Sequence, residues 1–262
     1  MSLNAYHREV DYIVRDHHPL LHGIAQTAEW IREDEFPAAP EWADEHEKWL
    51  RFVDGKGQWN RLRPRLVKSA YQRDRTFSEI GIAYFLEQMC SLPIVEWEPD
   101  GNDGTKGEYL VDAKTDQIFV EVKTGGWQKD IKDAEGSTSL RFAQPKYIHA
   151  EARSVSNSQV IRNAVTNGYK KFGGSRPNLL VIKDDYWVDL DDHLGPDIAL
   201  YRSGDGLFRN QRYDRLGGVG IFRVQLSGDG LTYHFSLCEN PMAMNPVKLP
   251  QNAFHGYPRR SE

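Results

Sequence analysis

Three residues in one short stretch carry side chains that could perform catalysis. The stretch, residues 107–126, reads GEYLVDAKTDQIFVEVKTGG and offers Glu108, Glu121 and Lys123. Carboxylates are the hard oxygen ligands that Mg²⁺ prefers, together with water and substrate phosphate oxygens. A bound metal activates a water, and a nearby ammonium orients that water or stabilises developing negative charge. These residue types therefore fit metal-assisted hydrolysis of a phosphodiester.

A β-hairpin is predicted to hold these side chains. Apolar and polar residues alternate along 109–112 and 118–123, and this period of two is typical of half-buried strands. The polar residues 114–117 separate the two runs, as a hairpin turn would. We expect the turn to be centred between Thr115 and Asp116.

That turn position fixes which residues face one another across the hairpin. It places Glu108 opposite Lys123 and Asp112 opposite Phe119. Glu108 and Glu121 then lie on one face of the sheet, roughly 7 Å apart along the strand, within reach of a shared cation. Asp112 shares that face and is a reserve metal ligand if the register differs.

The tripeptide Glu121-Val122-Lys123 resembles the ExK element of the PD-(D/E)xK nuclease superfamily, which has the restriction-endonuclease-like fold. Glu108 takes the place of the family's acidic residue, although Gly107-Glu108 stands where the family usually has Pro-Asp. The resemblance implies that Glu108, Glu121 and Lys123 are catalytic, with Mg²⁺ as the metal and Mn²⁺ as its substitute. A solvent-facing ion pair on an amphipathic strand would give the same tripeptide. The choice between an ion pair and a nuclease site therefore depends on the surrounding elements.

The neighbouring segments predict helices and strands in an order that the resembled fold also has. After the hairpin, a helix and then a buried strand return the chain to the same sheet. In the helix after the hairpin, Lys170 and Lys171 are expected to point outward. We therefore expect an α/β fold with a restriction-endonuclease-like core, a mixed central β-sheet flanked by helices, and an N-terminal helical region. The predicted helices are 76–90 and 158–172, and the predicted strands are 94–97, 178–182, 198–201, 219–226 and 231–237.

Glu79 lies in the helix that precedes the hairpin. In the resembled family this helix often carries a glutamate near the metal, so Glu79 is a predicted metal ligand beside Glu108, Glu121 and Asp112. Thr76 stands three residues before Glu79, and this spacing also fits a capping box, in which the glutamate is structural. Both interpretations are open at this point.

Charge divides the chain of 262 residues, whose net charge is −5. Residues 1–60 contain six Lys or Arg and twelve Asp or Glu, whereas the remainder is nearly neutral. Apolar side chains recur at helical spacing over residues 3–53. We expect an acidic helical region over 1–60 and a nuclease-like domain over 61–262, with its core at about 76–182 and a strand-rich part at 183–245.

Residues 61–75 reverse this acidity with six basic residues and one acid. Such a run can contact a phosphate backbone without reading sequence, and a solvated link between helices would explain it equally well. Two later basic residues could line a substrate groove. The predicted nucleic-acid-binding residues are Arg61, Arg63, Arg65, Lys68, Arg73, Arg75, Arg141 and Lys146.

These observations and the resemblance predict a Mg²⁺-dependent DNA endonuclease. The resemblance implies a role in restriction, defence, repair or transposition. The alternative is a catalytically inactive module on the same fold that binds nucleic acid or protein. If duplex DNA is the substrate, we expect a homodimer or a protein partner, because two strands need two sites. The chain has two cysteines, no apolar run of membrane-spanning length and no apolar N-terminal signal segment, which favours a cytoplasmic location without membrane attachment.

Overall fold

The structure, a computed structural model, describes residues 39–68, 70–124, 157–184, 194–209, 211–227 and 230–250. The chain divides into two compact units: residues 1–81, 127–151 and 226–232 belong to the first, and 82–126, 152–225 and 233–262 to the second. The predicted division at residue 60, which rests on charge, stays a prediction. No helix in the described ranges has both the length and the hydropathy needed to cross a membrane.

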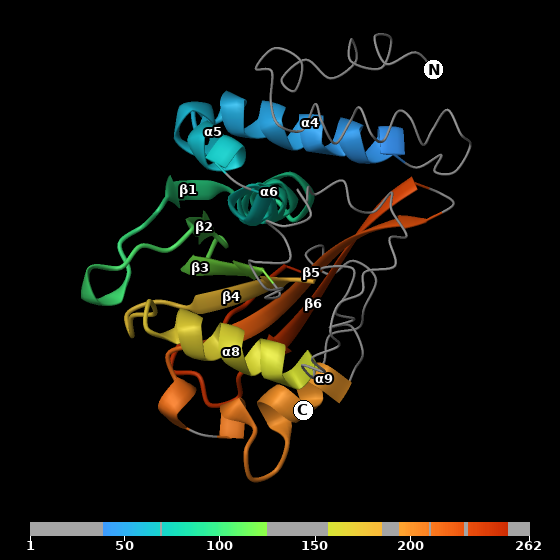
Figure 1. Cartoon of the computed structure of the whole chain (residues 1–262). Helices are drawn as coiled ribbons and strands as arrows, with labels where there is room; N and C mark the ends of the chain where they lie inside the picture. Colours follow the sequence, from blue (N-terminus) through green and yellow to red (C-terminus); the bar gives the residue numbers. More distant parts are fainter. Residues whose placement is uncertain are drawn as a thin grey trace. The chain divides into compact units, whose positions relative to one another are not determined.

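Three helices form most of the described part of the first unit: α4 (Ala39–Gly55), α5 (Trp59–Lys68) and α6 (Ala70–Tyr84) up to Gly81 (Figure 1). Helices α4 and α6 meet at Trp49, whose ring lies against Gly81. A Cβ on Gly81 would lie 2.8 Å from Cη2 of Trp49, so this helix contact needs glycine. The predicted N-terminal helical region is thus helical over α4, and residues 1–38 lie outside the described ranges.

The predicted start of the helix before the hairpin is wrong, because α6 begins at Ala70 instead of Thr76. Residues 70–75 are mostly strong helix formers, and the basic run therefore belongs to α5 and α6 instead of a solvated link. Thr76 lies inside α6, where its Oγ1 donates a hydrogen bond to the carbonyl oxygen of Gln72 at 2.7 Å. The capping-box interpretation of Thr76 and Glu79 is therefore wrong as well.

The second unit is built on a six-stranded sheet with the order β1-β2-β3-β4-β5-β6. Neighbours pair antiparallel from β1 to β3 and parallel from β3 to β5. Helix α8 (Asn157–Tyr169) lies in the connection between the parallel strands β3 and β4 (Figure 1). The predicted α/β class, a mixed sheet with flanking helices, is confirmed. The strands are β1 (Ile94–Trp97), β2 (Tyr109–Asp112), β3 (Gln117–Thr124), β4 (Asn178–Lys183), β5 (Gly218–Ser227) and β6 (Gly230–Glu239).

Helical residues cover both faces of the sheet. Gly168 of α8 lies against β4 on one face, where a Cβ would come within 3.1 Å of Cδ1 of Leu180. On the other face Phe85, in the π-helical turn η1 (Phe85–Met89), packs 5.2 Å from the ring of Phe222 and 5.5 Å from that of Phe235. Every residue of β4 is buried, as expected for a strand between two covered faces.

One predicted strand is wrong, because residues 197–201 are helical. They form the π-helical turn η4 (Asp197–Tyr201), which follows α9 (Leu194–Pro196). A short apolar run does not distinguish a strand from a buried helical turn. Here Pro196 precedes the run, and Arg162 donates a hydrogen bond to the carbonyl oxygen of Ile198 at 2.9 Å. The remaining short helices are η2 (Asn102–Gly104), η5 (Leu207–Arg209) and η6 (Gln211–Tyr213).

The glycine before Glu108 is predicted to be essential for stability. A Cβ on Gly107 would lie within 2.8 Å of three atoms of the Phe119 ring, which is buried and cannot swing into solvent. We expect Gly107→Ala to lower the free energy of unfolding by about 1–3 kcal/mol in urea denaturation. Gly173→Ala is the matched control, because nothing lies within 4 Å of a Cβ there. Equal effects of the two substitutions would contradict this account.

Candidate active site

Glu121 lies in the interior of β3 and its side chain is fully buried, with 0% of its surface exposed. The strand is hydrogen bonded on both sides, to β2 and to β4, where Glu121 is in register with Leu180. A carboxylate in such a position is costly unless cations and hydrogen bonds compensate for the lost water, since the penalty is several kcal/mol per ion.

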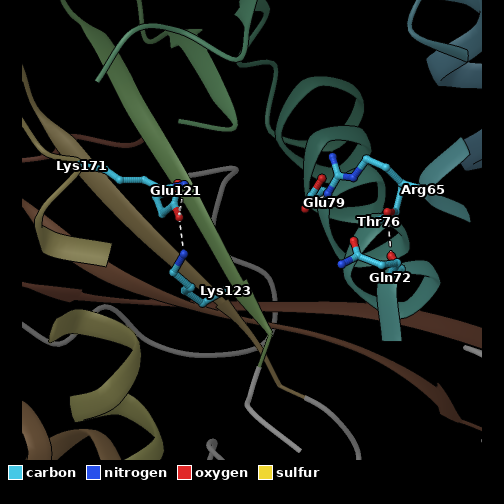
Figure 2. Close-up of polar contacts among 7 residues, drawn as sticks. All are labelled: Arg65, Gln72, Thr76, Glu79, Glu121, Lys123 and Lys171. Carbon is cyan, nitrogen blue, oxygen red and sulfur yellow. Dashed lines mark hydrogen bonds and ion pairs between the residues drawn. The ribbon is translucent and has the colours of Figure 1, made fainter. Parts of the chain in front are cut away.

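Two lysines supply that compensation (Figure 2). Nζ of Lys123 donates a hydrogen bond to Oε1 of Glu121, and Nζ of Lys171 lies 2.8 Å from both Oε1 and Oε2. The side chains of Lys123 and Lys171 are 21% and 20% exposed, so both reach the surface while the carboxylate of Glu121 does not. We call these three residues the Lys–Glu–Lys cluster. Its formal charge is +1 when all three are ionised.

Lys171 reaches Glu121 from the end of α8, and the prediction that it points outward is wrong. The helix ends at Tyr169, after which the helical period no longer sets the direction of a side chain. Backbone bonds hold the position: the amide of Lys171 donates to the carbonyl of Gly168 at 3.0 Å, and its carbonyl accepts from the amide of Asn102 at 2.8 Å. A lysine fifty residues from Glu121 is thereby held at its carboxylate.

The hairpin register differs from the prediction by two residues. Leu110 pairs with Phe119, and Asp112 pairs with Gln117 instead of Phe119. The regular register ends at Tyr109, because the amide of Glu108 donates to the carbonyl oxygen of Val120, the partner of Tyr109, at 3.0 Å, and the predicted pairing of Glu108 with Lys123 is therefore wrong. A shift of two leaves the side chains of the paired residues 109–112 and 117–120 on their predicted faces. Glu108 is half-buried, one residue before β2.

The turn explains the register. Lys114 has a left-handed backbone, with φ of 70°, and the amide of Ala113 donates to the carbonyl of Asp116 at 3.0 Å. Oδ1 of Asp112 accepts a hydrogen bond from the amide of Lys114 at 2.9 Å. Asp112 is exposed and stabilises this four-residue turn, and its role as a reserve ligand stays a prediction.

Glu79 has a cationic partner in the first unit. An Nη of Arg65 donates a hydrogen bond to Oε1 of Glu79, whose side chain is 5% exposed while that of Arg65 is 28% exposed. This ion pair joins α5 to α6, and it gives both residues a structural role. The predicted metal role of Glu79 is untested.

The predicted nucleic-acid-binding residues lie in different environments. Arg63 and Lys68 on α5 are exposed, whereas Arg73 on α6 is buried with 6% of its surface exposed. Arg61 is half-buried and donates to Oε1 of Gln58 at 2.8 Å, and Arg75 is also half-buried. Arg141 and Lys146 lie outside the described residues.

The side chains around Glu121 offer few oxygen ligands to a divalent metal. No group of three or more Asp, Glu, His or Cys side chains suited to a metal occurs in the described part of the chain. Mg²⁺ nevertheless needs only one or two carboxylates with water and substrate oxygens. Glu121 supplies one such carboxylate, with Glu108 as the second predicted ligand, and the ammonium groups at Glu121 show that its oxygens bind cations.

Thiol chemistry is excluded as an alternative. Cys90 and Cys238 are both buried, and this burial raises the pKa of each thiol to about 12. Both thiols are therefore protonated at neutral pH, and neither is a thiolate nucleophile.

Comparisons with known proteins add little to this description. No family model matches the chain, and no curated protein matches it. Among solved structures, "The structure of Pyrococcus Furiosus SfsA in complex with Ca2+" matches with 16% sequence identity and a TM-score of 0.25. The match covers 62% of this chain and 62% of that protein's chain. Similarity at this level supports no argument about fold or function.

The Lys–Glu–Lys cluster predicts a specific pattern of stability. Lys123→Met and Lys171→Met each leave one ammonium on Glu121, so each is expected to lower the free energy of unfolding by about 1 kcal/mol. The double variant leaves a buried carboxylate without a cation, and we expect it to lose about 3–5 kcal/mol. Urea denaturation at pH 7 measures all three.

Adding Glu121→Gln to the double variant provides the control, because it removes the buried charge and should restore part of the lost stability. Additive effects of the two lysine substitutions would show that they do not share Glu121 as a partner.

Proposed function

We propose that this chain is a metal-dependent endonuclease that hydrolyses phosphodiester bonds of DNA, with Mg²⁺ as its metal. One observation carries the proposal: the ammonium of Lys123 contacts the carboxylate of Glu121, two residues earlier on the same face of β3. The same two residues form the ExK element that resembles the PD-(D/E)xK superfamily. That resemblance extends the proposal to a role in restriction, defence, repair or transposition.

The residues have distinct roles in the proposed reaction. Glu121 and Glu108 would hold the metal, which when bound activates a water and offsets charge on the phosphate. Lys123 donates a hydrogen bond to the attacking water or to the phosphate oxygens on which negative charge develops. The water oxygen attacks phosphorus, one phosphorus–oxygen ester bond breaks, and the products are a phosphomonoester and a hydroxyl.

The charge at the site favours an anionic substrate. The Lys–Glu–Lys cluster has a formal charge of +1, and the side chains of both lysines are partly exposed. Positive charge on side chains that reach the surface attracts an anionic phosphate. This supports a phosphodiester substrate and does not distinguish DNA from RNA.

Residues on α5 are proposed to add contacts to the DNA backbone. Arg63 and Lys68 are exposed, so they are the members of the basic run best placed for phosphate contacts. Arg65 is less suited, because it is bound to Glu79. We keep a homodimer or a protein partner in the proposal for duplex cleavage.

A second candidate function is a catalytically inactive module that binds nucleic acid or protein. The observation that favours it is the engagement of both Glu121 oxygens by ammonium groups. The two functions differ in their response to divalent ions. Titration with Mg²⁺ or Mn²⁺ should give saturable binding for the enzyme and none for the inactive module.

Lys123 is predicted to be essential for cleavage. We expect Lys123→Ala to lower the rate by at least about 100-fold, because it removes the group that orients water or stabilises charge. The assay uses supercoiled plasmid, single-stranded DNA and RNA, each with Mg²⁺, Mn²⁺ or EDTA. Lys114→Ala is the control, since Lys114 is an exposed lysine in the hairpin turn. Wild-type turnover by folded Lys123→Ala would remove Lys123 from the mechanism.

Glu108→Gln is predicted to lose far more activity than Asp112→Asn. Glu108 lies one residue before β2, at the end far from the turn, where its amide bonds to the carbonyl oxygen of Val120, the neighbour of Glu121. Asp112 instead pairs with Gln117 at the turn and bonds to the amide of Lys114. An amide has the shape of the carboxylate without its charge, so Glu108→Gln should also weaken Mg²⁺ binding by about tenfold or more. Cleavage rates and calorimetric Mg²⁺ titrations measure both variants. An inactive Asp112→Asn beside an active Glu108→Gln would assign the ligand to Asp112.

A further inference from the structure

Lys171 occupies both oxygens of the one carboxylate that β3 buries. Its Nζ lies 2.8 Å from Oε1 and from Oε2 of Glu121, whereas Lys123 donates to Oε1 (Figure 2). A cation that binds through these oxygens has to compete with that ammonium. The position of Lys171 therefore affects cation binding at Glu121 as well as the stability of the fold.

The arrangement of Lys171 allows its side chain to leave while the backbone stays. The backbone is fixed on both sides, by Gly168 through the amide and by Asn102 through the carbonyl. The side chain is 20% exposed, so rotation about its own bonds can carry the ammonium into water. Rotation of an exposed side chain is fast compared with movement of a strand or helix. Lys123 can then keep its contact with Oε1 on β3.

We infer that Lys171 is the resident counter-ion of Glu121 and is displaced when a divalent metal binds, so that it sets the metal affinity of the site. The inference rests on the proposed function, because it takes Glu121 as a metal ligand. Metal and ammonium exclude each other from the same oxygens, so each weakens the binding of the other by the same factor. Lys171 thus keeps the carboxylate neutralised in the metal-free protein and lowers its affinity for metal.

The test is a calorimetric titration with Mg²⁺, repeated with Mn²⁺, on the full chain without DNA. Methionine keeps the length of the lysine side chain and removes its charge. We expect Lys171→Met to bind the metal at least about tenfold more tightly than wild type, since an opposing charge in contact with the carboxylate is removed. Lys171→Gln, which keeps a neutral donor, should be intermediate and carries the test if the methionine variant does not fold.

Two further variants control the measurement. Lys170→Met makes the same change in net charge on the neighbouring residue, which is exposed. It should therefore alter the affinity by no more than about twofold. Glu121→Gln should abolish the binding that Lys171→Met strengthens.

The outcomes separate this inference from the proposed function. Unchanged or weaker metal binding by Lys171→Met, beside wild-type binding that depends on Glu121, overturns the inference alone. Tighter binding by Lys171→Met with no cleavage by any variant supports the inference and overturns the nuclease. Absence of metal binding by wild type and by both Lys171 variants overturns both. If Lys170→Met increased the metal affinity as much as Lys171→Met, the change in net charge alone would explain the effect, and the inference would be overturned.

Discussion

The burial of one carboxylate is the constraint on which the described site depends. Glu121 stands on a strand that is paired on both sides and covered on its face by α8, so water cannot solvate it. The fold compensates with Lys123 from the same strand and Lys171 from the end of the helix above. Gly168 belongs to the same solution, because a side chain there would come close to Leu180 and to the carbons of Glu121 and Lys123. Removing both lysines would leave an ion in the interior with no partner.

The faces of the hairpin could be predicted from the sequence, and its register could not. A period of two assigns each side chain to a face, and that assignment survives a shift of two residues. The register depends on a turn in which Lys114 adopts a left-handed backbone and the carboxylate of Asp112 bonds to the Lys114 amide. Neither feature follows from the pattern of apolar and polar residues, because lysine rarely adopts that conformation. The prediction therefore placed the turn one residue too late.

The errors that remain arose at places where tertiary contacts decide the structure. Periodicity predicted α8 and β4 but gave no signal for Lys171, which follows the last helical residue and meets a partner fifty positions earlier. The helix α6 begins before Thr76 because residues 70–75 are mostly helix formers. Glu79 in this helix is bound by Arg65 of α5, a contact that spacing along the chain does not predict. The sequence did predict Glu121 and Lys123 as site residues, because they are only two positions apart on one strand. The other cationic partner of Glu121, Lys171, could not be predicted from the sequence because it lies fifty residues away along the chain.

The separation between Glu121 and Lys171 has a consequence for the order in which the protein assembles. The β2–β3 hairpin can close early, because its turn joins adjacent residues and little chain entropy is lost. The hairpin face that carries Glu121 is not expected to be buried at that stage, because burial would remove water from the carboxylate while Lys123 is its only cationic partner. We expect the carboxylate to stay hydrated until α8 has formed and Lys171, two residues after its end, has reached the strand. Water is therefore excluded from this part of the core only after the contact between Lys171 and Glu121 has formed. This contact is slow to form because its residues are far apart along the chain.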